Sequence, residues 1–283
     1  MIYECHGHII LDSVAYAGAV ARHEKIVDEV FVRQNLMTCA ENGIVFYRDG
    51  GDKHGVSVFA KKIACEYGID YRTPAYIIHK KGYYGGMFGV AFENMSEYRK
   101  LISDAIRLGA DFIKLTASGM LDLAGGGDVA GHSMSGTELC ELVNVAHGEG
   151  LSVMIHANGA DNIKRAAEAG ADSIEHGFYM DRDALGIMAH TGAVWTPTVV
   201  TISNLIGSGR YNDEMLVRLF DDHKNALMDA AAIGVPVACG SDAGAALVPQ
   251  GTGAHNELSV LESLGIDPGP GNHRIMEVFR RKC

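Results

Sequence analysis

Cys5-His6-Gly7-His8, close behind the apolar start Met1-Ile2-Tyr3, begins a pattern that recurs along the chain. Each time, a short apolar run leads to a side chain that can bind a metal ion or take part in catalysis. Enzymes with a barrel of alternating strands and helices place such groups at the carboxyl ends of their parallel strands. Imidazole and carboxylate ligands in these positions indicate a divalent metal centre. The later members of the pattern are Lys114 after 111–113, His156 after 151–155, His176 after 171–175 and Asp242 after 235–241.

Glycines divide the chain into repeated units, in which a helix-like stretch ends at Gly and a short β-rich run follows. Strands that alternate with helices predict a parallel sheet. Eight such units predict an α/β fold of the (β/α)8 TIM barrel type, with residues 1–283 as a single domain. A doubly wound sheet usually carries a Gly-rich fingerprint after its first strand, where this chain has His-Gly-His. We expect strands near 2–6, 43–48, 73–78, 111–115, 151–155, 172–175, 193–197 and 235–239, and helices near 24–41, 56–67, 95–108, 135–149, 159–169, 181–191, 212–233 and 254–264.

Composition limits the partners of the chain. Its formal net charge of −11 disfavours nucleic acid as a partner. It has no apolar run of about 18 residues, so we expect no membrane span. The start lacks the basic patch and apolar stretch of a secretion signal. The cysteines form no close pairs, which fits a reducing compartment, so we expect a cytoplasmic protein that acts on a small molecule. The cysteines are Cys5, Cys39, Cys65, Cys140, Cys239 and Cys283.

His6 and His8 fall on one face of a strand, because strand side chains alternate with period two. Taken alone, the pair has about even odds of being ligands or ordinary polar residues at a strand end. His156 and His176 end consecutive strands, and Asp242 ends the last strand, which lies beside the first in a closed barrel. All these side chains can therefore converge over one barrel mouth.

Lys114 is the exception in this set, because an ammonium group would be repelled by two neighbouring divalent cations. It must lie away from the site, be neutral, or be chemically altered. A lysine carbamate, formed with carbon dioxide, would turn the cation into a bridging carboxylate.

At this point the chain resembles the binuclear metal-dependent amidohydrolase superfamily, and most closely its prolidase-like and imidazolonepropionase-like branch. The resemblance extends over nearly the whole length. The matching segments are Cys5-His6-Gly7-His8, Gly109-Ala110-Asp111-Phe112-Ile113-Lys114-Leu115, Ala146-His147-Gly148-Glu149-Gly150, Ile155-His156-Ala157-Asn158-Gly159, Ser173-Ile174-Glu175-His176-Gly177 and Gly240-Ser241-Asp242-Ala243-Gly244.

The resemblance implies two metal sites. By similarity His6, His8 and Asp242 bind one ion, His156 and His176 bind the other, and a carboxylated Lys114 bridges them. Zinc is the first choice of metal, while manganese, cobalt or iron would suit the same nitrogen and oxygen ligands. Two such ions would lower the pKa of a bridging water to give hydroxide. Asp242 would carry the proton to the leaving amine.

The implied reaction is hydrolysis of amide (C–N) bonds, of dipeptides or N-acyl amino acids, by a peptidase-like hydrolase. Single-metal deaminases, to which the chain is less similar, carry a different pattern. They have a glutamate shortly after the strand-five histidine and no strand-four lysine. Here Ala157-Asn158-Gly159-Ala160-Asp161 follows His156. The alternatives are a lactonase or phosphotriesterase on the same binuclear centre, or a non-catalytic metal-binding barrel.

Relatives of this branch usually carry an accessory β-sandwich, for which the sequence given leaves no room. We expect a barrel that lacks this sandwich, with self-association into a homo-oligomer as one way to cover the surface. Loops on the mouth side offer further residues that could touch substrate. These candidates are His79, Tyr83, Tyr84, His132, Tyr211 and His255.

Overall fold

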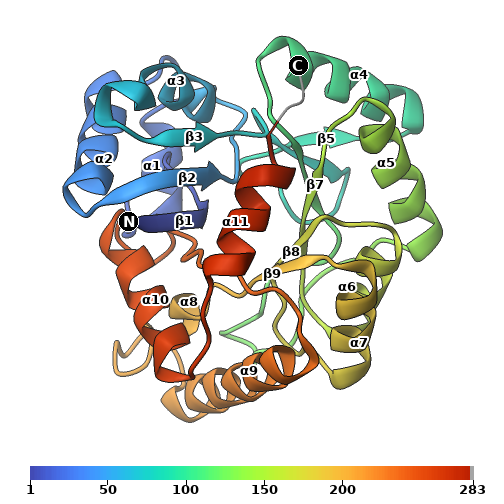
Figure 1. Cartoon of the computed structure of the whole chain (residues 1–283). Coiled ribbons are helices and arrows are strands. Elements are labelled where there is room, and N and C mark those ends of the chain that lie inside the picture. The colour runs from blue at the N-terminus through green and yellow to red at the C-terminus, as the bar shows by residue number, and fades with distance from the viewer. Residues whose placement is uncertain (281–283) are drawn as a thin grey trace.

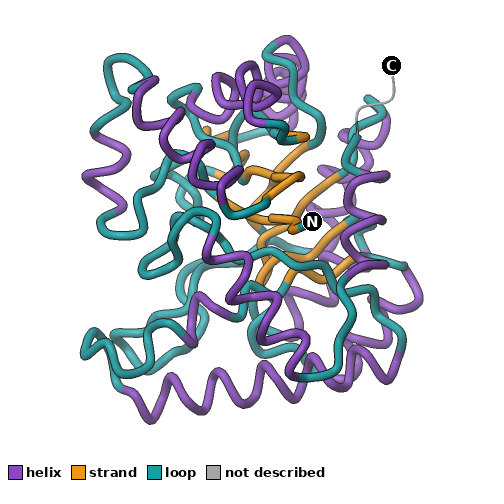
Figure 2. Tube along the Cα trace, turned by 60° about the vertical axis from the view of Figure 1, so that its left-hand side comes forward, coloured by secondary structure: helices purple, strands orange, loops and turns teal. Residues whose placement is uncertain are grey.

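Short parallel strands form the centre of the molecule, and helices surround them (Figures 1 and 2). The structure is a computed structural model that describes residues 1–280. Cys283, which is among the cysteines expected to be unpaired, and the last three residues of the predicted domain lie outside the described residues. The strands are β1 (Ile2–Gly7), β2 (Ile44–Asp49), β3 (Asp70–Arg72), β4 (Ile77–Lys80), β5 (Val90–Phe92), β6 (Ile113–Thr116), β7 (Val153–Ala157), β8 (Ser173–His176) and β9 (Val194–Thr196). The helices are α1 (Tyr16–Ala21), α2 (Glu29–Glu41), α3 (Val56–Ile63), the 3-10 turn η1 (Ala64–Tyr67), α4 (Met95–Arg107), α5 (Gly136–Gly148), α6 (Ala160–Glu168), α7 (Arg182–Thr191), α8 (Val200–Ser203), α9 (Asp213–Ile233), α10 (Thr252–Ser263) and α11 (Gly269–Val278).

The strands pair in parallel, in the orders β1-β2-β3 and β5-β4-β6-β7-β8-β9. The predicted strand 73–78 is divided between β3, which pairs with β2, and β4, which pairs with β6. Pro74 lies in the gap and has no N–H group for a ladder hydrogen bond. The Asp111 N–H donates to the Thr73 carbonyl at 2.8 Å and links the two sheets across this gap.

The predicted strand 235–239 is irregular, yet its backbone bonds to both of its neighbours. Trp195 N–H donates to Pro236 O at 2.9 Å, and Ala238 N–H donates to Trp195 O at 2.8 Å. On the other side, Cys5 N–H donates to Cys239 O at 2.9 Å. The segment therefore lies between β9 and β1, and the predicted (β/α)8 barrel is confirmed. Pro236 interrupts the ladder because it cannot donate.

Local signals explain where several of the helices begin. The side chains of Asn94, Ser135, Asp181 and Asn212 accept hydrogen bonds from backbone N–H groups in the first turns of α4, α5, α7 and α9. Such caps satisfy donors that the helix itself leaves free. The helix predicted from residue 24 starts later, at Glu29, because Asp28 is its cap.

α11 was not predicted, and it lies across one end of the strands in the centre of Figure 1. Its Ile275, with Phe279 just after the helix, packs in a buried cluster with Phe46 and Phe112 from the barrel. This helix therefore fills the amino-terminal end of the barrel and leaves the carboxyl end for a site. Within residues 1–280, no helix is long and apolar enough to cross a membrane.

Candidate metal centre

The barrel brings the six side chains of the sequence pattern to one end. His6 lies in β1 and His8 just beyond it, Lys114 lies in β6, His156 in β7 and His176 at the end of β8. The ring centroids of His6 and His176 are 4.9 Å apart, and those of His156 and His176 are 4.6 Å apart. The spatial convergence that the sequence suggested is thus present, while the ligand roles stay predictions.

His6, His8 and Asp242 form the tightest group. One possible ligand atom from each lies within 4.8 Å of those of the other two. The Asp242 Oδ1 atom lies 3.7 Å from His6 Nε2 and 3.5 Å from His8 Nε2. Two imidazole nitrogens and a carboxylate oxygen at this spacing are a suitable donor set for a divalent ion.

Buried polar atoms without a partner mark the same place. Within residues 1–280, His8 Nδ1, Lys114 Nζ and Asp242 Oδ1 are buried and have no hydrogen-bond partner in the protein. Burying a polar group without a partner costs free energy, so folded proteins rarely leave several of them together. The atoms on Lys114 and Asp242 fit a site whose missing partner is a bound ion, toward which His8 would direct Nε2, the nitrogen 3.5 Å from Asp242 Oδ1.

Burial also sets the ionisation of these groups. It lowers the pKa of His8 and of His156 to about 3, and the Lys114 charge adds to the effect, so both rings are neutral near pH 7. A neutral imidazole is the form that binds a metal. Burial lowers the pKa of Lys114 to about 8 and raises the pKa of Asp242 to about 7.

A buried ion pair holds His6 from behind. His6 Nδ1 lies 2.7 Å from Glu175 Oε2, which leaves His6 Nε2 directed toward Asp242. Arg48, which is fully buried, donates from one terminal nitrogen to both Glu175 oxygens at 2.9 Å. Partners of this kind fix the tautomer and orientation of metal-binding histidines. Sequence reasoning did not assign these roles, although Arg48 is a charge in a strand segment that begins with the apolar run Ile44-Val45-Phe46.

His176 is held from the next strand. Its Nδ1 atom lies 2.8 Å from the Thr198 hydroxyl. His176, Thr198 and Asp242 have φ values of 65°, 50° and 60°, a left-handed conformation that is uncommon for residues other than glycine. Such strain persists where the surrounding structure enforces it, most often at functional sites. Glu257 contributes to that enforcement, because its carboxylate accepts from Val199 N–H and Val200 N–H, both at 3.0 Å.

His156 is held by a loop. Its Nε2 atom lies 3.0 Å from the Gly119 carbonyl, to which Asn158 also donates at 3.3 Å. An Nε2–H bond to a carbonyl leaves the Nδ1 lone pair for a ligand. Asn158 Nδ2 also lies 3.3 Å from His156 Nε2, so Asn158 helps to orient this ring.

A cavity of about 260 Å³ opens beside the metal centre. Of the residues predicted to touch substrate, Tyr84 and Tyr211 line it, and the Tyr84 ring centroid is 4.8 Å from that of His156. The lining is otherwise mainly apolar and aromatic. It comprises His8, Leu11, Tyr16, Tyr84, Gly85, Met87, Phe88, Met120, Leu121, Leu123, His156, Asn158, His176, Phe178, Thr201, Ile202, Leu205, Tyr211, Asp242, Ala245 and Ala246.

The other four candidates lie elsewhere. His79 is buried in β4, while Tyr83 and His132 pack together with ring centroids 5.4 Å apart. His255 belongs to α10, and its Nε2 atom lies 2.8 Å from Asn42 O. Among the residues that the structure describes, none of these four lines the cavity. Their contact with substrate stays a prediction.

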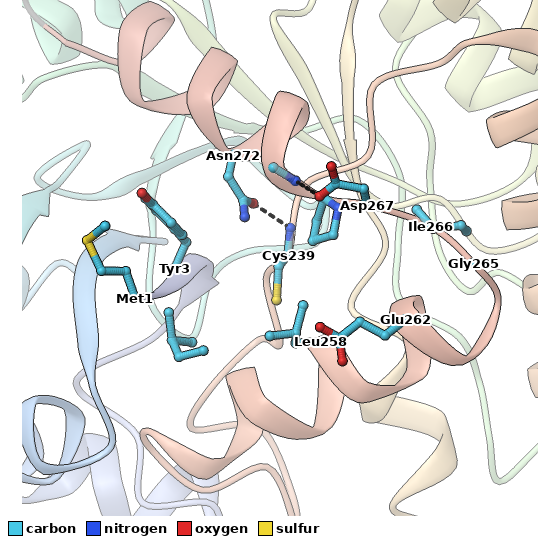
Figure 3. Close-up of a pocket in the computed structure, with 12 residues that line it drawn as sticks. Met1, Tyr3, Cys239, Leu258, Glu262, Gly265, Ile266, Asp267 and Asn272 are labelled. Carbon is cyan, nitrogen blue, oxygen red and sulfur yellow. Dashed lines mark hydrogen bonds between the residues drawn. The ribbon is translucent and has the colours of Figure 1, made fainter.

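A second hollow, of about 420 Å³, lies at the start of the strands (Figure 3). Figure 3 shows Met1 and Tyr3 beside Cys239 and Asn272, whose side-chain oxygen accepts from Cys239 N–H at 2.8 Å. It is larger than the cavity beside His8 and Asp242, but it lies at the end of the barrel that usually serves stability. Its lining includes none of the six predicted metal-binding side chains. The smaller cavity is therefore the better candidate for an active site.

Comparison with known proteins finds a family match and two similar curated proteins. The profile of the amidohydrolase family matches residues 27–272. The ochratoxinase of Aspergillus niger is 28% identical over 239 residues, which are 82% of this chain and 46% of that protein. An uncharacterized protein of Mycobacterium tuberculosis is 27% identical over 201 residues, which are 69% of this chain and 53% of that protein. The chain thus spans about half the length of these curated relatives.

Solved structures share the fold. A Xaa-Pro dipeptidase with methionine bound in its active site is 21% identical with a TM-score of 0.74, and the match covers 98% of this chain and 72% of that one. The Aspergillus niger ochratoxinase structure is 22% identical with a TM-score of 0.72, covering 98% and 69% of the two chains. At these identities the likeness establishes the barrel fold alone.

Proposed function

The chain belongs to the amidohydrolase family, and from this premise we propose that it is a metal-dependent hydrolase that cleaves amide bonds. The observation that carries the proposal is the group of His6, His8 and Asp242, whose ligand atoms lie within 4.8 Å of one another beside an apolar cavity. His156 and His176 lie next to this group and supply the donors for a second ion.

The proposed cofactor is a pair of divalent ions, with zinc as the first choice and manganese, cobalt or iron as substitutes. Lys114 would bridge them as a carbamate. The buried position of Lys114 supports this, because its lowered pKa of about 8 increases the share of neutral amine, the form that attacks carbon dioxide. When bound, such ions polarise a substrate carbonyl and lower the pKa of a water molecule.

The side chains divide the remaining work. Asp242 accepts the proton of the attacking water and donates it to the leaving nitrogen, as general base and then general acid. Glu175 and Thr198 hold the rings of His6 and His176 through their Nδ1 atoms. The apolar lining excludes bulk water, which strengthens electrostatic interactions in the site.

Dipeptides and N-acyl amino acids are the proposed substrates. Two relatives support an amide bond as the target, since one carries the name ochratoxinase and the other Xaa-Pro dipeptidase. We further propose that the protein acts in the cytoplasm. The free thiols of Cys5, Cys39, Cys65, Cys140 and Cys239 agree with a reducing compartment.

Turnover of dipeptides, N-acyl amino acids, lactones and phosphotriesters by the metal-loaded protein tests the proposal. We expect hydrolysis of amides, its loss on treatment with a chelator, and its return when metal is restored. Turnover of lactones or phosphotriesters without any amide would favour the lactonase or phosphotriesterase alternative. A fully metal-loaded protein that turns over none of them would favour the non-catalytic barrel.

A further inference from the structure

The cavity beside the metal centre has an unusually uncharged lining. Tyr16, Tyr84 and Phe88 give it aromatic surface, and all three are only partly buried, so their rings remain available to a ligand. His8 and Phe88 are stacked with centroids 5.7 Å apart, so this surface continues directly from the metal centre. Within residues 1–280, no Lys, Arg or Glu side chain lines the cavity, and Asp242 is its one carboxylate.

The size of the cavity suits one compact apolar group. A dry protein cavity of roughly 150 Å³ is enough for benzene. The volume of about 260 Å³ found here is larger, and so accommodates a substituted ring or a branched alkyl group together with the bond to be cleaved.

A carboxylate that lies away from the proposed metal ions would be a poor occupant of this cavity. There it would lose its hydration without gaining a cationic side chain, and an unpaired buried charge is costly. Two cationic side chains, Arg210 and Arg218, line a neighbouring pocket of about 530 Å³. The two pockets share Leu123 and Tyr211, so they adjoin at these residues.

We propose that the cavity selects amides with an uncharged apolar group, aromatic or branched aliphatic, next to the scissile bond. A carboxylate elsewhere in the substrate then lies past Tyr211, toward Arg210 and Arg218. This inference rests on the proposed function and narrows its substrates. Among dipeptides and N-acyl amino acids, it favours those whose half of the molecule inside the cavity is apolar and uncharged.

A matched substrate series tests the selection. Amides are compared in which one half at a time carries a methyl, a benzyl or a 4-carboxybenzyl group. We expect kcat/KM for the benzyl compound to exceed that for the methyl compound by roughly 10-fold or more in at least one series. The 4-carboxybenzyl compound of that series should fall about 100-fold below the benzyl compound. Equal rates for the charged and neutral compounds would overturn the inference.

Binding measurements separate this inference from the proposed function. Benzyl methyl ketone and its 4-carboxy analogue contain no bond that the enzyme can hydrolyse, so calorimetric titration reports the cavity alone. Tighter binding of the neutral ketone supports the inference even if no amide is turned over. Equal or tighter binding of the carboxylate contradicts it even if amides are hydrolysed.

A charge placed on the lining gives the sharpest control. Met120 lines the cavity and is 43% exposed, so Met120→Arg adds a cation where the fold tolerates it. Met228 on α9 is 46% exposed and lies away from the cavity, so Met228→Arg makes the same change of charge elsewhere. We expect Met120→Arg to improve binding of the carboxylate ketone relative to the neutral one by about 10-fold, and Met228→Arg to leave the ratio unchanged. Equal affinity ratios of the carboxylate and neutral ketones in the two variants would overturn the inference. If Met120→Arg fails to fold, Met87→Arg repeats the test at another half-exposed lining position.

Discussion

Two neighbouring layers of polar side chains in the barrel differ in how many of their buried polar atoms have a hydrogen-bond partner. In the mouth ring, three buried atoms, on His8, Lys114 and Asp242, have no partner within residues 1–280. In the ion-pair layer, which lies behind His6, the buried polar atoms bond to one another. The mouth ring comprises His6, His8, Lys114, His156, His176 and Asp242, and the ion-pair layer comprises Arg48, Ser173, Glu175 and Thr196.

This difference indicates that the mouth ring serves to bind ions and that the ion-pair layer serves to support it. The Arg48 guanidinium is committed to Cys5 O, Ser173, Glu175 and Thr196, and the Phe279 ring lies 4.4 Å from its carbon. A fully satisfied buried network makes its surroundings rigid. The unsatisfied ring above it is costly unless something binds there. The ion-pair layer thus fixes the positions of neighbouring side chains, and the mouth ring keeps ligand atoms free for ions.

Replacing Asp242 by Asn should have the largest effect on turnover. The amide cannot accept the proton of the attacking water, so we expect kcat on amides to fall about a thousand-fold. Circular dichroism should show an unchanged fold, because Asp242 Oδ1 makes no hydrogen bond within the described chain. Activity that survives this change would remove Asp242 from the proton-transfer role.

Replacing Arg48 by Met should have the largest effect on stability. The change leaves Glu175 buried without its cation, which costs about 3–5 kcal/mol of unfolding free energy. Arg182 provides the matched control, because its ion pair with Asp229 is exposed and Arg182→Met should cost far less. Urea unfolding of both variants measures the contrast. Equal losses would show that the ion-pair layer does not support the barrel.

Replacing Thr198 by Val tests whether the ring depends on its holders. The change removes the hydroxyl that meets His176 Nδ1 while keeping a branched side chain of the same shape. Loss of such a partner typically lowers metal affinity about 10- to 100-fold. Thr198→Ser keeps the hydroxyl and should restore the affinity. A Val variant that binds metal as tightly as the Ser variant would show that the contact is only structural.

Replacing Glu257 by Gln tests the buried carboxyl group through the dependence of stability on pH. The amide keeps one oxygen acceptor for the two N–H groups of Val199 and Val200, so some stability is lost at every pH. Burial raises the pKa of Glu257 to about 8, from 4.5 in an exposed carboxyl. The folded state therefore holds a proton that the unfolded state has released, and stability falls as pH rises from about 5 to 8. The amide introduced by Glu257→Gln cannot titrate, so the variant should lose roughly 3–4 kcal/mol less than the parent over this range. Urea unfolding at pH 6 and pH 8 measures this, and identical slopes for parent and variant would contradict the assignment.

The sequence predicted the barrel and the convergence of its ring for a physical reason. Each predicted ligand ends a short apolar run, and parallel strands bring such ends to one edge. The ion-pair layer was harder to foresee, because Arg48 and Glu175 are 127 residues apart and meet only across the closed barrel. The irregular course of 235–239 depends on Pro236 and on pairing with both neighbours, which no local pattern reveals. The apolar lining was missed because Tyr16 and Phe88 lie in segments whose position depends on the complete fold.

Metal content is the most direct test of the claim that the mouth ring binds metal ions and that the ion-pair layer supports it. The protein is purified without chelator, loaded with zinc, freed of excess metal, and analysed by elemental analysis beside an Asp242→Asn variant. We predict close to two ions per chain in the parent and a lower content in the variant, because Asp242 is a proposed ligand. A reproducible value of zero in the folded parent would contradict the account.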